Sequence, residues 1–405
     1  MVLFDESRAG KKGTEPEGLA VAEYNGVRYG FVGSERSNFV AVYDLTDPRA
    51  PRFTQLLPTT NGPEGILPIP SRGLLAVSSE EDSAEDGVRA TVTLFRLGKG
   101  APATPSVVSG DDATGAPIAW GALGALSADP AAPHRLWTVT DAAYAPTRLL
   151  TLDTRRAPAV VTTELTVRDA DGNPVAYDAE GVYARPGGGF WLAVEGRKGP
   201  ENKLVLLDER GVTRRTVPLP AEVAAGLGGQ GFEGVTARKD AAGREIVWAA
   251  LQREVAGDPA GVVRIGRYDV AADSWSWYGY RLGTTTVAGD WIGLSEITVV
   301  GDRLAVVERD KLNGPAARVK QVHTVPLPSG PAPAGTLPVL EKRLALDVLP
   351  ALRAGKGWTQ EKLEGLAVAG DGTLFAVTDN DALDAATGET VLLDLGKAKR
   401  YRYLR

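Results

Sequence analysis

Short apolar runs alternate with turn residues along the whole chain. Runs of four to eight residues, such as 149–153 and 204–208, are rich in Leu and Val and end at an Asp. Runs of this length, bounded by Gly, Pro and Asp, are typical of β-strands. Only the segment 221–227 favours a helix, and it is short. The pattern therefore predicts an all-β protein.

A longer motif recurs seven times along these runs. Each copy has an acid followed by Gly, a short apolar run, and a second apolar strand ending in an acid, as from Glu17-Gly18 to Glu35. The third copy is degenerate at Leu123-Gly124, and the sixth replaces the Gly in Ser295-Glu296-Ile297. The units begin near residues 17, 64, 123, 180, 233, 296 and 364.

This repeat predicts a seven-bladed β-propeller with four-stranded antiparallel blades, forming a single domain over residues 1–405. Seven units of about 58 residues suit a four-stranded blade with its loops. The seventh unit lacks an outer strand, which either Lys399–Leu404 or Val2–Phe4 would supply. We expect long insertions near residues 98–119, 253–262 and 311–340, and no linker that divides the chain.

The repeated acids are expected to gather at one end of the propeller. The first strand of each blade lines the axis, and we take the second strand to return to the same face. The inner ring would then hold Glu17, Glu64, Glu180, Glu233, Glu296 and Glu364. A second tier would hold Glu35, Glu80, Asp141, Glu195, Glu308 and Asp379. So many neighbouring carboxylates require bound cations, raised pKa values or paired bases.

Carboxylates without His or Cys favour Ca²⁺, with Mg²⁺ or Mn²⁺ next, because these hard cations take oxygen ligands. The chain has no Cys and only two His residues. Bases also follow the second strands, and Arg36, Arg253 and Arg309 are the candidates for gripping the anionic part of a substrate. A purely structural alternative stays open, in which each Glu caps backbone N–H groups of the neighbouring blade.

Composition excludes several other functions. The net charge of −6 gives no field that would attract nucleic acid. No segment reaches the roughly 18 consecutive apolar residues of a membrane span. The absence of Cys excludes a thiol nucleophile, and no Gly-x-Ser-x-Gly motif marks a serine hydrolase.

The Glu-Gly units, Leu294-Ser295-Glu296-Ile297 and residues 374–381 resemble the bacterial "esterase-like activity of phytase" family of propellers. The likeness is strongest from Trp120 to Asp381, and the first two units resemble those of related secreted propellers. The resemblance implies a secreted or periplasmic protein that hydrolyses an ester or a phosphate ester. The opening residues lack the features of a signal peptide, so either the protein is cytoplasmic or a leader is missing from the sequence, and the resemblance favours the missing leader.

Two functions remain as hypotheses. The first is a metal-dependent esterase or phosphoesterase that acts on a small-molecule substrate and is a monomer. Its metal ligands would lie in the inner Glu ring, and Glu308 or Asp379 would be the general base. The second is a non-catalytic propeller that binds a protein, a glycan or an ion. The aromatic run Trp275–Tyr280 would stack a sugar in that case, or else pack within a strand.

Overall fold

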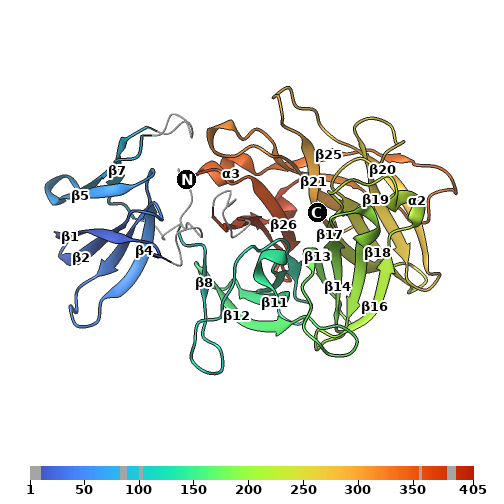
Figure 1. Cartoon of the computed structure of the whole chain (residues 1–405), viewed down its shortest axis with the longest axis horizontal. Helices are drawn as coiled ribbons and strands as arrows, with labels where there is room; N and C mark the ends of the chain where they lie inside the picture. The colour runs from blue at the N-terminus through green and yellow to red at the C-terminus, as the bar shows by residue number, and fades with distance from the viewer. Residues whose placement is uncertain (1–10, 83–88, 100–103, 355–357, 381–388) are drawn as a thin grey trace.

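The computed structural model describes residues 11–82, 89–99, 104–354, 358–380 and 389–405 (Figure 1). Within these ranges the strands form seven mostly antiparallel sheets, and the helices are short, such as α2 (Ala221–Ala224) and α3 (Leu349–Ala354). The predicted all-β class is confirmed. The sheets have three, four or five strands, so seven equal four-stranded blades are not confirmed. No described helix has the length and apolar character needed to cross a lipid bilayer.

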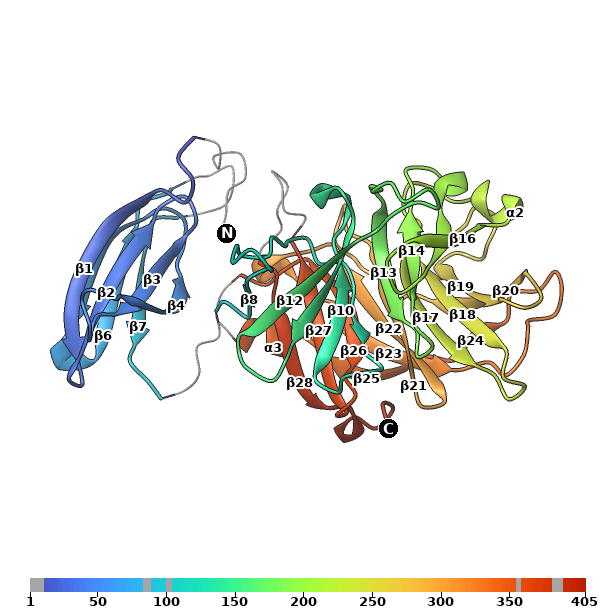
Figure 2. The same cartoon turned by 90° about the horizontal axis from the view of Figure 1, so that it is seen from below.

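The first two sheets pack on each other and form what we call the two-sheet unit. Its strands are β1 (Pro16–Tyr24), β2 (Val27–Ser34), β3 (Phe39–Asp44), β4 (Arg52–Pro58), β5 (Pro63–Ile69), β6 (Leu74–Ser79) and β7 (Thr91–Arg96). Phe31, Val40 and Val42 of one sheet meet Leu75 and Val77 of the other in a buried cluster. Figure 2 shows this unit set to one side of the other five sheets.

The remaining strands form five sheets in which each first strand is followed by its hairpin partner. The strands are β8 (Val107–Ser109), β9 (Ser127–Ala128), β10 (Arg135–Val139), β11 (Arg148–Asp153), β12 (Ala159–Thr166), β13 (Asp178–Ala184), β14 (Phe190–Glu195), β15 (Lys203–Leu207), β16 (Thr213–Pro218), β17 (Phe232–Lys239), β18 (Glu245–Leu251), β19 (Val262–Asp269), β20 (Ser274–Arg281), β21 (Ile292–Val300), β22 (Arg303–Asp310), β23 (Lys320–Pro326), β24 (Val339–Leu340), β25 (Arg343–Asp347), β26 (Lys362–Val368), β27 (Thr373–Asp379) and β28 (Leu392–Lys397).

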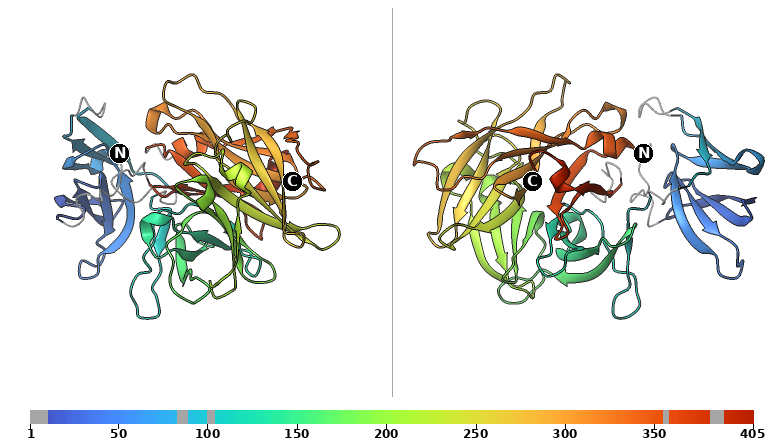
Figure 3. Two further views of the ribbon diagram at one scale, coloured as in Figure 1. Left: turned by 45° about the vertical axis from the view of Figure 1, so that its right-hand side comes forward. Right: turned by 180° about the vertical axis from the view of Figure 1, so that it is seen from behind.

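These five sheets pack face to face in a closed cycle, which we call the five-sheet ring (Figure 3). Each joint is an apolar cluster shared by two neighbouring sheets. The closing joint places Leu136 and Val161 of the β8–β12 sheet against Phe375 and Val377 of the β26–β28 sheet. Each of these sheets is buried on both faces, and its strands therefore carry apolar residues on both faces.

The predicted ring-closing strand at 399–404 is wrong. That segment forms a short 3-10 turn, and Leu404 packs into the cluster between the last two sheets. The other candidate, Val2–Phe4, lies outside the described residues. Two of the expected insertions add a parallel edge strand, since β8 pairs with β12 and β24 pairs with β20. The insertion near 253–262 is the connection between β18 and β19.

Candidate functional site

A β-bulge marks the repeated acid-Gly pair in three strands of the five-sheet ring. The pairing register slips by one residue at Glu180 in β13, Glu233 in β17 and Glu364 in β26. In each strand the Glu is the extra, unpaired residue, and such bulges re-aim a side chain. The Gly that follows permits close approach of the next first strand. A Cβ on Gly181 would lie 2.8 Å from the amide nitrogen of Val235.

The acids of β13 and β14 come together at this end of the ring. Asp178 lies directly across the hairpin from Glu195. Carboxylate oxygens of Asp178, Glu180 and Glu195 all lie within 4.8 Å of one another, and the three side chains are half-buried. We call these three residues the acidic triad. Three carboxylate oxygens this close together suit the coordination of a hard divalent cation.

The triad carries negative charge in a poorly hydrated place. Burial raises the pKa of the Glu195 carboxyl to about 7 and raises that of Asp178 as well. Burial, followed by the charges of Glu233 and Glu364, raises the pKa of Glu180 well above the usual glutamate value. Burial and the charge of Glu195 do the same for Glu233, which is 3% exposed. The group therefore favours either bound protons or a bound cation.

Two bases stand beside these acids. The Nη2 atom of Arg309 donates a 2.7 Å hydrogen bond to Oε1 of Glu364, and Nη1 lies 3.5 Å from Glu361. Nζ of Lys362 lies 3.5 Å from Asp379. The second oxygen of Glu364, Oε2, is buried and makes no hydrogen bond with any described residue. Arg309 and Lys362 thus offset the negative charges of Glu361, Glu364 and Asp379 more directly than they offset those of the triad.

Glu296 does not join this group. In β21 the extra residue of the bulge is Ser295, so Glu296 takes the position that Gly holds in the other units. Its oxygens accept hydrogen bonds from the N–H groups of Ile297 at 2.8 Å and Leu126 at 3.4 Å, and Leu366 also donates. Ile297 and Leu366 belong to neighbouring sheets, and Leu126 immediately precedes β9 of a third sheet. Glu296 is therefore placed as the backbone cap that the structural alternative describes.

Glu308 points away from the acids for the same reason. Glu308 pairs with Leu294, as Val194 and Thr378 pair with the residue before the bulge in other units, and Arg309 holds the place taken there by Glu195 and Asp379. Glu308 Oε2 accepts hydrogen bonds from Tyr280 at 2.8 Å and Lys342 at 2.7 Å, and Oε1 accepts one from the Gly283 N–H at 3.2 Å. Both oxygens are engaged between two sheets. The predicted base at Glu308 is thus turned away from the triad.

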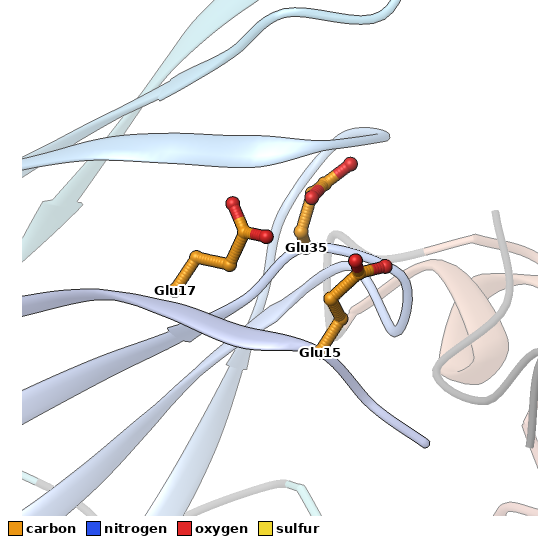
Figure 4. A group of neighbouring side chains, drawn as sticks. All are labelled: Glu15, Glu17 and Glu35. Carbon is orange, nitrogen blue, oxygen red and sulfur yellow. The ribbon is translucent and has the colours of Figure 1, made fainter. Parts of the chain in front are cut away.

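Glu17, Glu64 and Arg36 lie in the two-sheet unit, so the predicted single ring of six glutamates does not form. Oxygens of Glu15, Glu17 and Glu35 lie within 4.8 Å of one another (Figure 4). Arg36 donates a 2.9 Å hydrogen bond to Glu15 and forms a 2.9 Å ion pair with Glu35. Here the bases contact the acids directly, which leaves less negative charge for a cation.

Arg253 lies near the edge of the acidic group. Its guanidinium donates to the carbonyl of Ile292, pairs with Glu254 at 3.2 Å and lies over the Trp291 ring at 5.2 Å. Arg309 lies over the same ring at 5.4 Å. Trp275 stacks on Trp277 and Phe232 within a buried cluster. That placement fits the packing alternative for the aromatic run.

Sequence reasoning missed Asp178 as a ligand and placed Glu195 only in the second tier. The available signal was the local sequence Asp178-Ala179-Glu180-Gly181, which puts two carboxylates before one Gly. In a regular strand they would share a face, and the bulge brings them together with Glu195 instead.

Comparison with known proteins agrees with the repeat. The family model "Esterase-like activity of phytase" matches residues 118–382, and the model "Choice-of-anchor I domain" matches residues 3–48. No curated protein matches the chain.

Solved structures of low identity align along most of the chain. A periplasmic gluconolactonase from Pseudomonas aeruginosa is 15% identical, with 94% of this chain and 96% of that chain covered and a TM-score of 0.32. A protein from Lactobacillus plantarum is 10% identical, with 94% and 100% covered and a TM-score of 0.34. A luciferin-regenerating enzyme is 10% identical, with 96% and 93% covered and a TM-score of 0.33.

Proposed function

Because the chain belongs to the family described as esterase-like activity of phytase, we propose that it hydrolyses a small ester or phosphate ester at the acidic triad with a bound divalent cation. The observation that carries this proposal is the convergence of Asp178, Glu180 and Glu195 within 4.8 Å. No described base forms an ion pair with any of the three, so their charge needs a partner.

The donor set fits the cation. Carboxylate oxygens alone favour Ca²⁺, and Mg²⁺ or Mn²⁺ are the next candidates. The unpaired Oε2 atom of Glu364 is a second, independent polar group that awaits a partner. When bound, such a cation polarises the ester and makes water more acidic.

The residues around the triad have complementary roles in this proposal. Arg309 holds Glu364 through Oε1, which fixes the carboxylate and leaves Oε2 free to accept a proton from water. Lys362, next to Asp379, supplies positive charge for an anionic substrate group, and Asp379 positions that lysine. Arg253 stands at the edge, over Trp291, where a substrate phosphate would approach.

The test combines metal analysis with hydrolysis of p-nitrophenyl acetate and p-nitrophenyl phosphate. We expect Ca²⁺ to raise the melting temperature, because a ligand of the folded state stabilises it. Glu180→Gln should abolish that shift and reduce hydrolysis at least tenfold. Glu17→Gln is the matched control, since it removes one carboxylate from the other acidic cluster. Hydrolysis that survives exhaustive chelation would contradict the proposal.

A non-catalytic binding protein is the second candidate, and the exposed faces of the two-sheet unit favour it. Calcium binding without hydrolysis of either ester would support this alternative. We further propose a secreted or periplasmic location, in line with the family, and a monomeric state. Fractionation of cells expressing the full gene and light scattering of the purified chain test these two points.

A further inference from the structure

A buried arginine without a partner lies in the sheet of β17–β20 and β24. Arg267 in β19 is 3% exposed, and no described residue forms a hydrogen bond or an ion pair with its side chain. Its Nε atom is buried and unsatisfied. A guanidinium is always charged, so burying it without compensation is strongly unfavourable. Some partner that is not part of the described protein would remove that cost.

The position of Arg267 is one that the fold otherwise reserves for apolar side chains. Val263 and Ile265 precede it on the same face of β19 and are fully buried in the cluster between two sheets of the ring. The residue directly opposite Arg267 on β20 is Ser276, whose Oγ is also buried without a partner. Two unsatisfied polar groups therefore face each other across one pair of strands.

A pocket of about 260 Å³ opens beside the guanidinium. It is lined by Arg238, Lys239, Trp248, Arg267, Asp302 and Ser329, among others. Arg238 and Lys239 are the last two residues of β17, and Glu233 is the second residue of the same strand. This pocket therefore lies at the opposite end of the sheet from the acidic triad. Trp248 and Arg267, which line it, lie on the neighbouring strands β18 and β19 (Figure 2).

The neighbouring acids do not neutralise the pocket. Asp240 Oδ1 accepts the amide N–H groups of Ala242 and Arg244, and Oδ2 accepts from the Arg244 guanidinium. Asp302 forms no ion pair with Arg267. Its carbonyl accepts the N–H of Leu327, which fixes the loop over the pocket, and Tyr278 fixes the same loop by donating to Gly330 at 2.6 Å. Arg238, Lys239 and Arg267 line the pocket together with the carboxylates of Asp240 and Asp302, while Glu245 lies across the hairpin from Lys239 and the Arg238 guanidinium donates to the Gly301 carbonyl.

We propose that this pocket binds a small oxyanion, a carboxylate or a phosphate, through the guanidinium of Arg267. The planar fork of arginine matches both groups in a bidentate manner. Lys239, which is exposed and also lines the pocket, adds attraction. The site is independent of the acidic triad and of any hydrolysis there.

Thermal melting and calorimetry with inorganic phosphate and with acetate, at matched ionic strength in chloride, test this proposal. The wild-type chain should melt higher with at least one of the anions. Arg267→Met should weaken binding at least tenfold and, without anion, should melt no lower than wild type, because it removes an unpaired buried charge. Arg281→Met is the matched control, since Arg281 is exposed on β20 of the same sheet and does not line the pocket.

The rim provides a variant that does not touch the core. Lys239→Glu should weaken anion binding about threefold or more without lowering the melting temperature in chloride. It remains informative if Arg267→Met fails to fold. A wild-type protein whose melting is unchanged by both anions, or an Arg267→Met protein that responds as wild type does, would overturn the proposal. A response to phosphate alone, or to acetate alone, identifies which oxyanion the pocket takes.

Discussion

Arg309 and Glu364 form an almost completely buried ion pair that joins two neighbouring sheets of the five-sheet ring. The two side chains are 3% and 2% exposed, and Nη2 of Arg309 lies 2.7 Å from Oε1 of Glu364. One comes from the end of a second strand, and the other from the bulge of the next first strand. The pair therefore joins the ring at the same place where the acidic group gathers.

Replacing one partner of this ion pair should lower the free energy of unfolding more than replacing both partners. Arg309→Met leaves Glu364 buried and without its partner, and we expect a loss of about 3–5 kcal/mol in the free energy of unfolding. The double variant Arg309→Met with Glu364→Met should recover most of that loss. Urea unfolding of the two single variants and the double variant measures this. A double variant as unstable as the worse single variant would show that the two residues are not coupled.

Stability should depend on pH through Glu195. Burial raises the pKa of this carboxyl from 4.5 to about 7, so between these values the folded chain holds more protons than the unfolded chain. The free energy of unfolding without metal should therefore fall as the pH rises from about 5 to 8, by about 2 kcal/mol from this group.

Two comparisons isolate that effect. Glu195→Gln should flatten the pH dependence, because glutamine stays neutral at every pH. Saturating Ca²⁺ should also flatten it, if a cation takes the place of the proton. A chain whose stability without metal rises between pH 5 and 8 would contradict the assignment of Glu195.

The repeats made much of the fold predictable, since the seven units and their hairpins follow directly from the apolar runs. The sequence did not predict which residue of each strand occupies the bulge. Aligning Glu296 and Glu308 with the acids of other units is wrong by one residue, because Ser295 occupies the bulge and Arg309 occupies the end of the second strand. Because a strand alternates faces at every residue, that offset of one residue puts Glu308 on the opposite side of its sheet. Neither apolar spacing nor composition reports where a bulge lies.

Gly234, which packs against Glu296, provides a test of the backbone hydrogen bonds that Glu296 accepts. A Cβ on Gly234 would lie 2.5 Å from both Oε1 of Glu296 and the amide nitrogen of Ile297. Gly234→Ala should therefore displace the cap and lower the free energy of unfolding by about 1–3 kcal/mol. Gly228→Ala is the control, because nothing lies within 4 Å of its added Cβ, and it should change stability by no more than about 0.5 kcal/mol. Equal effects of the two substitutions would contradict the close packing at the axis.

The outer faces of the two-sheet unit carry apolar residues at alternate positions. Leu19 is 72% exposed and Leu67 is 61% exposed, whereas Leu75, between the two sheets, is 4% exposed. Leu19→Lys should therefore change the free energy of unfolding by no more than about 0.5 kcal/mol, while Leu75→Ala should cost about 2–5 kcal/mol. Chemical denaturation with a probe of the N-terminal sheets measures both. A cost above about 2 kcal/mol for Leu19→Lys would mean that its face is covered in solution, as a single ring of seven sheets would require.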